Sequence, residues 1–369
     1  MRVTALNLRH FRNYHALDLS FEKNINIFSG NNAQGKTNLL EAIYIAAVGR
    51  SHRTSVDAEL ISWQQDGANI EINFVRQEVE NAVSIRFTRN QNKVVSLNSH
   101  PIKTRDLIGN LTAVLFSPED LTLVKGAPAL RRRFLDIEIS QTSRAYYQQL
   151  LQYNRILQQR NNLLKKIRDR RAHIELLETW DKQLAAGAAV LVSKRKAALK
   201  KVAMLASLMH RKITDSQENL SIVYFQPYFN ENSDSEKDTI LADWYFQKMQ
   251  QARDIDFARG ISTVGPHRDD LVLSVNGINL RTYGSQGQQR TGVLALKLAE
   301  LEYIKSESGE YPILLLDDVM SELDSSRRDQ LIAFIKDRIQ TFITATDEEL
   351  FHQPKFAAFF RINQGQVMG

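Results

Sequence analysis

The residues with the clearest chemical potential lie near the N-terminus, at positions 30–37. They match the pattern G-x-x-x-x-G-K-[ST] in full, with a short apolar run before them and a helical pattern after them. Glycines in such a loop let backbone N–H groups turn toward phosphate oxygens, and the helix start adds the positive end of its dipole. The pattern predicts a phosphate cradle in which Lys36 contacts the β- and γ-phosphates and Thr37 ligates Mg²⁺. We expect ATP to bind at Gly30, Asn31, Asn32, Ala33, Gln34, Gly35, Lys36, Thr37 and Asn38.

A phosphate cradle of this kind needs a second metal ligand at the end of another strand. The apolar run 313–316 is followed by Asp317 and Asp318, and such a run is typical of a buried parallel strand. We expect Asp317 to hold Mg²⁺ through water and Asp318 to polarise the attacking water. A strand that ends in two aspartates is weak support by itself, but beside the cradle it predicts nucleotide hydrolysis.

A third element lies at 283–290, just before a helical pattern over 291–304. Its Ser-Gln-Gly-Gln-Gln-Arg string resembles the signature loop of ATP-binding-cassette (ABC) ATPases. In that family a helix start from one subunit caps the γ-phosphate bound to the other, which implies an ATP-dependent homodimer. The resemblance implies a catalytic role for Ser285 and nucleotide contacts for Ser285, Gly287 and Gln288. The alternative is a glycine turn that only caps a helix.

Several expected ABC features are altered. Most ABC ATPases carry Glu where this chain has Asp318, whose shorter side chain leads us to expect slow turnover. The segment 319–324 resembles the D-loop at the dimer interface. No switch histidine follows the expected strand 341–345, although Asp347 could take part of its role. No glutamine marks a Q-loop either; Ser117 and Glu119 lie where that loop is expected.

The positive charge is concentrated in one segment. The whole chain carries a formal charge of +6, but residues 130–212 alone contain 19 Lys and Arg against 6 Asp and Glu. Such an excess is typical of a surface that meets a polyanion, and the few aromatics favour phosphate contact over base stacking. Arg131, Arg132 and Arg133 are the first candidates for DNA contact, and the alternative is an ion-paired helix start. Arg50 and Arg53 are further candidates for nucleotide or DNA contact, with surface solubility as the alternative.

The pattern of elements predicts an α/β fold with a helical insertion. Short apolar strands alternate with turns over 1–125, and long helical patterns with a break near 169–172 fill the basic segment. After position 219 strands return, including an Asn-Gly hairpin at 275–278. We expect an ATPase head built from both chain ends, 1–125 and 259–369, with a helical arm inserted at 126–258.

Composition excludes several classes of protein. The 369 residues include no cysteine, which excludes disulfides and thiolate metal sites. Hydrophobic content of 43% and charged content of 24% are those of a globular protein rather than a disordered, collagenous or membrane protein. The N-terminus lacks an apolar signal segment, so we expect a cytoplasmic, nucleoid-associated protein.

A separation of 281 residues between Lys36 and Asp317 is typical of the SMC-like branch of ABC ATPases, whose members act on DNA. Within that branch the chain resembles the RecF family of bacterial recombination-repair proteins. The strings that carry this resemblance are Phe11-Arg12-Asn13-Tyr14, 30–42, 50–54, 116–121, 131–136, 159–165 and 265–271. The resemblance implies a weak, DNA-stimulated ATPase that dimerises with ATP on duplex DNA and on single-strand/double-strand junctions. It also implies partnership with RecR and RecO in placing RecA on gapped DNA.

Two other functional classes stay open at this point. A transporter ATPase subunit would have a compact helical subdomain without a basic excess, and a non-hydrolysing DNA-gap binding module would not need Asp317, Asp318 and Ser285. The string Gly-Pro-His-Arg-Asp-Asp at 265–270 also has two interpretations. His267 and Arg268 either belong to a structural turn with internal ion pairs or sense nucleotide or DNA.

Overall fold

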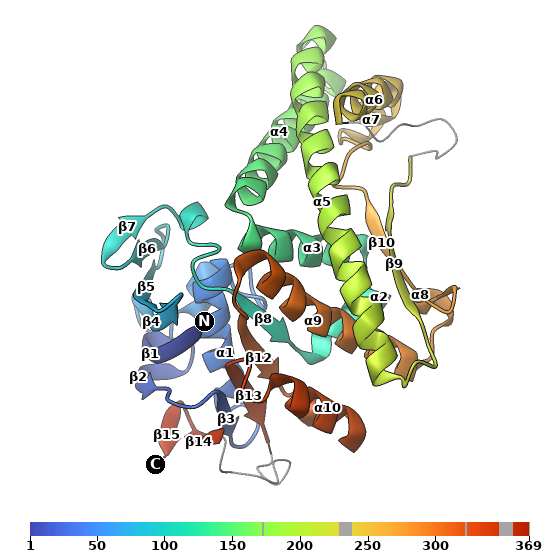
Figure 1. The fold of residues 1–369 in the computed structure, drawn as a ribbon. Coiled ribbons are helices and arrows are strands. Elements are labelled where there is room, and N and C mark those ends of the chain that lie inside the picture. Colours follow the sequence, from blue (N-terminus) through green and yellow to red (C-terminus); the bar gives the residue numbers. More distant parts are fainter. Residues whose placement is uncertain (172, 229–237, 322, 347–356, 369) are drawn as a thin grey trace. The chain divides into compact units, whose positions relative to one another are not determined.

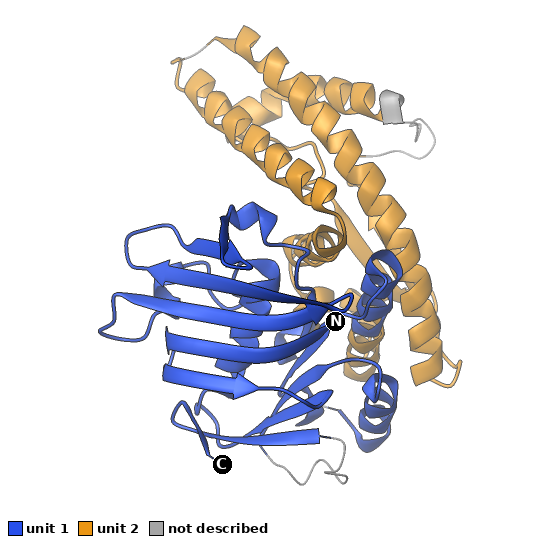
Figure 2. Cartoon of the chain, turned by 60° about the vertical axis from the view of Figure 1, so that its left-hand side comes forward, with its two compact units in different colours: residues 1–120, 297–369 blue, residues 121–296 orange. Residues whose placement is uncertain are grey.

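The computed structural model describes residues 1–171, 173–228, 238–321, 323–346 and 357–368. The chain forms two compact units: residues 1–120 and 297–369 are unit 1, and residues 121–296 are unit 2 (Figure 2). We expected the insertion to be 126–258. The segment 259–296 instead groups with unit 2, because its strand β10 (Asp270–Val275) pairs along its whole length with β9 (Leu220–Phe225).

Unit 1 contains a mostly parallel sheet with the strand order β15-β14-β3-β13-β12-β8 (Figure 1). Its central strands β3, β12 and β13 are almost wholly buried, as continuous apolar runs in parallel sheets should be. The bounds are β3 (Ile25–Ser29), β8 (Ala113–Phe116), β12 (Ile313–Asp317), β13 (Thr341–Ala345), β14 (Ala357–Asn363) and β15 (Gln366–Met368). The α/β fold class is confirmed, and both ends of the chain contribute to this sheet.

A second sheet of unit 1 is antiparallel, with the order β2-β1-β4-β5-β6-β7. Alternate residues of β4 are buried, which is the pattern of a sheet with one face on the core, and a register shift after Val3 interrupts the same pattern in β1. The strands expected in the first hundred residues are confirmed. The bounds are β1 (Arg2–Phe11), β2 (Tyr14–Ser20), β4 (Gly67–Arg76), β5 (Val79–Thr88), β6 (Val94–Leu97) and β7 (His100–Ile102).

Helix α1 (Lys36–Val48) packs against strands of both sheets of unit 1. Eleven of its thirteen residues are buried, so it has no solvent-facing side, as expected for a helix that is apolar all round. Its N-terminus therefore has a fixed position at the end of β3, between the two sheets. The other long helices here are α9 (Gln286–Ser308), which begins in unit 2 and continues into unit 1, and α10 (Ser325–Ile335).

Unit 2 is built on two long helices, α4 (Arg144–Arg168) and α5 (Leu177–Ile213), which pack along each other (Figure 1). We expected a helix break near 169–172, and α4 does end at Arg168, with turn residues at 169–171. The Asn-Gly hairpin is also confirmed: β10 and β11 (Ile278–Asn279) pair, and both turn residues have positive φ. The sheet β11-β10-β9 lies against α5 and α3. The other helices are α2 (Thr122–Lys125), α3 (Pro128–Thr142), α6 (Asp238–Gln251), α7 (Arg253–Arg259) and α8 (Leu280–Tyr283). Within the described residues, no helix is both long and apolar enough to cross a membrane.

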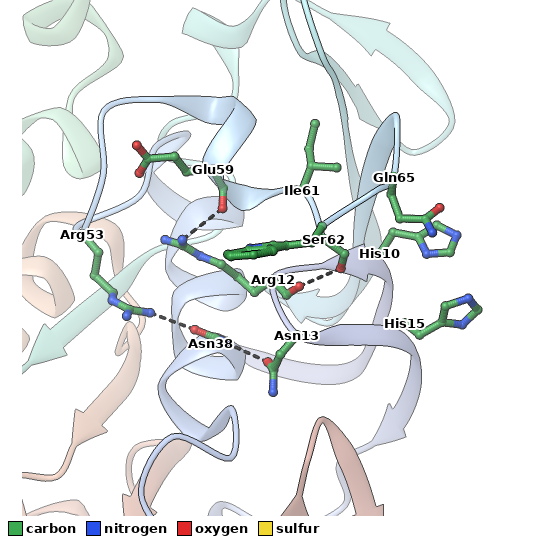
Figure 3. A pocket seen from close by; sticks show the side chains of 11 residues that line it. His10, Arg12, Asn13, His15, Asn38, Arg53, Glu59, Ile61, Ser62 and Gln65 are labelled. Carbon is green, nitrogen blue, oxygen red and sulfur yellow. Dashed lines mark hydrogen bonds between the residues drawn. The ribbon is translucent and has the colours of Figure 1, made fainter.

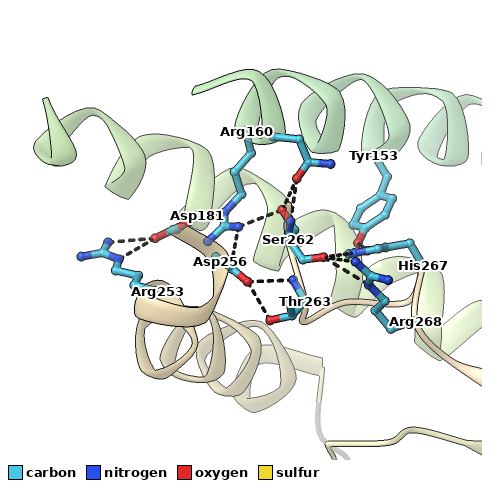
Figure 4. Close-up of polar contacts among 10 residues, drawn as sticks. Tyr153, Arg160, Asp181, Arg253, Asp256, Ser262, Thr263, His267 and Arg268 are labelled. Atoms are coloured by element: carbon cyan, nitrogen blue, oxygen red, sulfur yellow. Dashed lines mark hydrogen bonds and ion pairs between the residues drawn. The ribbon is translucent and has the colours of Figure 1, made fainter. Parts of the chain in front are cut away.

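A buried ionic network joins α4, α5 and α7 in unit 2 (Figure 4). Arg160 is fully buried and donates to Asp181 and Asp256, each at 2.7 Å, and to the Ser262 hydroxyl at 2.8 Å. Arg253 adds a second cation, 2.8 Å from Asp181. The two cations are matched by two anions inside the unit. An unpaired charge at such depth would cost several kcal/mol, so this pairing is needed for the unit to be stable.

The string at 265–270 belongs to the same region and has a structural role in unit 2. The Tyr153 hydroxyl lies 2.7 Å from His267 Nδ1, and His267 Nε2 lies 3.1 Å from the Ser262 carbonyl. Since a carbonyl only accepts, Nε2 carries the proton, Nδ1 accepts from the tyrosine, and the ring is neutral. Arg268 donates to the same carbonyl, and Asp269 accepts from two tyrosine hydroxyls. These contacts support the structural interpretation of the string over a sensing role.

The neutral state of His267 predicts a pH dependence of stability. Burial lowers the pKa of His267 to about 4, whereas an unfolded histidine titrates near 6.5. Below pH 6.5 the unfolded chain binds a proton that the folded chain excludes. The contribution to the free energy of unfolding is therefore complete above pH 6.5 and is lost as the pH falls toward 4.

Urea denaturation of the protein and of His267→Gln at pH 7 and pH 5 measures this contribution. We expect the unsubstituted protein to lose more stability than the variant on acidification, by about 2 kcal/mol. Equal losses in both proteins would contradict the buried neutral histidine.

Candidate active site

The carboxyl ends of three neighbouring parallel strands of unit 1 form the site. In register, Asp317 of β12 lies opposite Thr344 of β13, and Ala345 of β13 lies opposite Ser29 of β3. The chain leaves β3 into the loop that begins at Gly30. Ligand sites in open α/β sheets lie at such strand ends. The topology thus brings the expected cradle and the expected carboxylates together, although 281 residues separate Lys36 from Asp317.

Asp317 is held by two hydroxyl groups. Its Oδ1 accepts from Thr37 Oγ1 and from Thr344 Oγ1, both at 2.8 Å. Thr344 Oγ1 also accepts from the backbone N–H of Asp318 at 2.8 Å. One threonine therefore orients both aspartates. Thr344 was not among the residues expected at the site; the available signal was a polar residue near the end of the expected strand 341–345.

Asp318 has an uncommon backbone conformation. Its φ of 54° is left-handed, which costs energy for a residue other than glycine, and such conformations cluster at functional sites. The Thr344 hydroxyl holds its N–H, and Ser321 Oγ donates to its carbonyl at 2.7 Å. Asp318 is near enough to Lys36 for its charge to stabilise the lysine cation and raise its pKa.

The loop 30–37 has the geometry of a phosphate cradle. Gly30 and Gly35 have φ of 141° and 114°. A Cβ at Gly30 would lie 2.3 Å from the Ile362 carbonyl oxygen, and one at Gly35 would lie 2.5 Å from the Asn13 side chain. Both positions therefore require glycine. Asn31, Asn32 and Ala33 are exposed at the tip of the loop, and Gln34 is half-buried.

Lys36 closes over this loop from the first turn of α1. Its Nζ donates to the carbonyl of Asn31 at 2.8 Å and to that of Gly30. Burial lowers the pKa of Lys36, while Asp318 and Asp317 oppose that shift by stabilising the charge. Thr37 beside Asp317 supplies the oxygen ligands that Mg²⁺ prefers. These residues fit a magnesium–nucleotide complex.

A tight turn between β1 and β2 supports the cradle from outside. Phe11 pairs with Tyr14 across the two-residue turn, in which Arg12 has a φ of 54°. Asn13 Nδ2 donates to the Gln34 carbonyl at 2.9 Å, and the Tyr14 hydroxyl donates to that of Gly35 at 3.1 Å. The sequence offered this string only as part of a resemblance. The structure gives it a positioning role.

A buried carboxylate fixes that turn to α1. Arg12 donates to both oxygens of Glu41, at 2.6 and 2.9 Å, and Ser51 and Arg53 also donate to it. Burial alone would raise the pKa of Glu41, but the hydrogen bonds from Arg12 and Ser51 outweigh it and hold the pKa below its usual value. Arg53 also donates to the Asn38 side chain at 2.8 Å. Arg53 thus points to the start of α1, whereas Arg50 is an exposed residue after the helix.

A pocket of about 570 Å³ opens beside the start of α1 (Figure 3). Asn13, Asn38, Arg12 and Arg53 line it together with Trp63. Two of these residues also touch the cradle or follow it directly, because Asn13 donates to Gln34 and Asn38 follows Thr37. Two lining residues of the pocket thus adjoin the phosphate cradle within unit 1.

In unit 2, the expected signature loop forms the N-terminus of α9. The Gln288 N–H donates to Ser285 Oγ at 3.2 Å, and the Ser285 N–H donates to Gln288 Oε1 at 3.0 Å. This reciprocal pair is a capping box, which fixes the helix start. Ser285 and Gly287 are exposed, and Gln288 also donates to Glu218 at 2.8 Å. The loop therefore does cap the helix, as the alternative interpretation expected, and the same geometry leaves the helix start exposed to solvent.

The arginines first considered for DNA contact have different surroundings. Arg131 is buried and bonds both oxygens of Asp270, at 2.6 and 2.8 Å. The Arg131 charge is paired with Asp270 inside unit 2, which does not fit a DNA contact. The alternative interpretation, an ion-paired helix start, fits this arginine. Arg132 is half-buried and donates to the Asp269 carbonyl at 2.6 Å, whereas Arg133 is exposed.

The other ABC features expected from the sequence lie in turns of unit 1. Ser117 and Glu119 precede and occupy a 3-10 turn after β8, and Ser117 N–H donates to Asp120 at 2.7 Å. The D-loop segment contains a short turn at Val319–Ser321. Asp347 lies outside the described residues.

Comparison with known proteins is consistent with this geometry. Residues 2–367 match the model of the RecF/RecN/SMC N-terminal domain family. The full chain is 48% identical to a protein of Alkaliphilus oremlandii and 44% identical to one of Clostridium tetani, with the whole of each relative covered; both are named "DNA replication and repair protein RecF". The chain belongs to the RecF family.

Solved structures agree with the RecF assignment. A structure described as "recombination mediator protein RecF-ATP in RecFOR pathway" has a TM-score of 0.93 at 34% identity, covering 100% of this chain and 97% of that one. An Smc head domain from Pyrococcus furiosus, at 15% identity and a TM-score of 0.54, shares the fold. The RecF-family chain thus has an ABC-type ATPase fold of the SMC kind.

Substitution of Thr344 tests the arrangement of the two aspartates. We expect Thr344→Val to weaken magnesium-dependent ATP binding by roughly 10- to 100-fold, since it removes the hydroxyl that orients Asp317 and Asp318. Thr341→Val is the matched control on the same strand, where the buried hydroxyl donates to the Ile339 carbonyl rather than to either aspartate. Calorimetric titration with Mg²⁺ and ATP measures both variants. Equal effects in the two would contradict a specific role for Thr344.

Proposed function

We propose that this RecF-family chain is an ATP-dependent DNA-binding protein of recombinational gap repair. The observation that carries the proposal is the convergence of the glycine cradle, Thr37, Asp317 and Asp318 at adjacent strand ends. Relatives named for DNA replication and repair, and a RecF structure described with ATP, support it. A transporter subunit is not favoured, because the chain belongs to another family.

The proposed chemistry is slow hydrolysis of ATP. The backbone of 30–37 and Lys36 hold the phosphates, and Thr37 and Asp317 hold Mg²⁺, which neutralises phosphate charge when bound. Asp318 orients the attacking water from its strained turn. Its short side chain supports weak turnover, which suits a timing switch better than a motor. A chain that only bound nucleotide would not require this carboxylate.

The proposed active form is an ATP-dependent homodimer. Ser285, Gly287 and Gln288 present a capped helix start to solvent, and such a start attracts phosphate. In the dimer each of these helix starts meets the γ-phosphate in the partner's cradle. ATP would thus stabilise the dimer, because it contacts both subunits only in the closed state.

The proposed DNA contacts lie on the exposed basic side chains of unit 2 rather than on Arg131. Exposed cations in the last turn of α4 and just after it include Lys165, Lys166, Arg168, Arg170 and Arg171. Arg133, Arg50 and Arg53 remain candidate contacts. The proposed targets are duplex DNA and single-strand/double-strand junctions, and the proposed partner proteins are RecR and RecO, with RecA loaded downstream.

Measurement of molecular mass with Mg²⁺ and ATP, with and without gapped duplex DNA, tests the dimer. We expect a nucleotide-dependent dimer that Ser285→Arg abolishes, since a bulky cation at the helix start would block its approach to the phosphates. Ser221→Arg is the matched control, at an exposed position of β9.

A chain that stays monomeric with both ATP and DNA would overturn the dimer proposal. Loss of ATP hydrolysis in Lys36→Arg would separate the enzyme from a binding module that never hydrolyses. Hydrolysis at an unchanged rate in that variant would contradict the proposed site.

A further inference from the structure

Glu218, in the loop between α5 and β9, joins the signature loop to the end of α5. Its Oε1 accepts from Gln288 Nε2 at 2.8 Å. Its backbone carbonyl accepts from Thr214 Oγ1 at 3.5 Å and from His210 Nδ1 at 3.4 Å, and His210 lies in the last turn of α5. All four residues belong to unit 2, so these contacts lie within one compact unit.

The carboxylate of Glu218 selects one orientation of the Gln288 amide. In the capping box, Gln288 Oε1 accepts from the Ser285 N–H at 3.0 Å. A flipped amide would direct its NH₂ group at that N–H and would break the box. Because a carboxylate only accepts hydrogen bonds, Glu218 favours the orientation in which Nε2 points to it and Oε1 points to Ser285. Glu218 therefore acts on the start of α9 through Gln288.

The position of Glu218 is itself fixed by its neighbours. His210 is fully buried, and its Nε2 lies 3.8 Å from Glu218 Oε2. The next residue, Asn219, donates its N–H to the Asn276 side chain at 2.9 Å and accepts from the Asn276 N–H at 3.0 Å. Since the backbone is held on both sides of Glu218, its side chain meets Gln288 at a small further cost in conformational entropy.

Helix α5 extends from this joint to the basic end of the helical pair α4 and α5 (Figure 1). It has 37 residues, which makes it about 55 Å long at 1.5 Å per residue. It contains no proline, the commonest cause of a sharp kink. Its first residue, Leu177, follows the turn at 169–171 beside the cations proposed for DNA contact. A rigid element of this length is suited to carry energetic coupling between two distant sites.

We propose that Glu218 is a positioning residue that holds the signature loop in the geometry needed to meet the partner's γ-phosphate, and that it makes this geometry depend on α5. DNA bound at the basic end of α4 and α5 would then strengthen the ATP-dependent dimer through Glu218. The proposal rests on the proposed function, because it requires that dimer.

Hydrogen–deuterium exchange of the nucleotide-free, full-length protein tests the hold on the signature loop. Glu218→Ala should speed exchange over 285–290 by roughly 3- to 10-fold, the value of one hydrogen bond. Glu218→Gln should keep most of the protection, because its amide oxygen still accepts from Gln288. Asp215→Asn is the matched control, since Asp215 is an exposed carboxylate of the same loop.

Molecular mass with Mg²⁺ and ATP, with and without duplex DNA, tests the effect on the dimer. Glu218→Ala should weaken the ATP-dependent dimer by roughly tenfold and reduce its strengthening by DNA. The ATP affinity of the monomer should not change, because the cradle lies in unit 1. In a Gln288→Ala background, Glu218→Ala should have no further effect, since Glu218 acts through that side chain. Glu218→Met keeps the side-chain length without an acceptor and should repeat the alanine result.

The two readouts separate this inference from the proposed function. Unchanged exchange over 285–290 in Glu218→Ala and Glu218→Met would overturn the inference, whether or not the protein dimerises. Faster exchange with an unchanged dimer would also overturn it, because the contact would then be structural only. Full strengthening by DNA in these variants would contradict the link to α5. An unsubstituted protein that stays monomeric with ATP and DNA would contradict the proposed dimer itself.

Discussion

The two hydroxyl groups on one oxygen of Asp317 are the interaction on which the site depends. Thr37 and Thr344 reach this oxygen from the first turn of α1 and from β13, each at 2.8 Å. Asp317 is half-buried, and a carboxylate that loses part of its hydration needs such donors. The same oxygens suit Mg²⁺, so the interaction that orders the strand ends in this structure also prepares a metal ligand.

A second constraint fixes the phosphate cradle from the side of the antiparallel sheet. Both carboxylate oxygens of Glu41 accept hydrogen bonds from Arg12. The turn at Arg12 then places the Asn13 side chain where it donates to the Gln34 carbonyl of the phosphate loop. Gly35 passes so close to Asn13 that no side chain would fit there. The antiparallel sheet therefore acts as a support for phosphate binding, and Glu41 is the one charged residue of α1 after its first turn.

Contiguous motifs could be predicted from the sequence, and contacts between distant segments could not. The cradle at 30–37 and the carboxylate at Asp317 carry local patterns whose chemistry is general. Thr344 acquires its role only because β13 pairs with β12, and no local pattern reports that pairing. The expectation that Arg131 contacts DNA does not fit the structure for the same reason: its ion-pair partner Asp270 is 139 residues away in the chain. A charge count gives the number of cations in a segment but not which of them are already paired.

The magnesium dependence of ATP binding to Asp317→Asn tests this account most directly. Calorimetry should show that the unsubstituted protein binds ATP at least roughly tenfold more tightly with excess Mg²⁺ than with excess chelator. The variant should bind ATP equally in both conditions, at the metal-free affinity, since the cradle and Lys36 are intact. A variant that keeps the full metal enhancement would contradict the assignment of Asp317 and, with it, the central role of the strand ends.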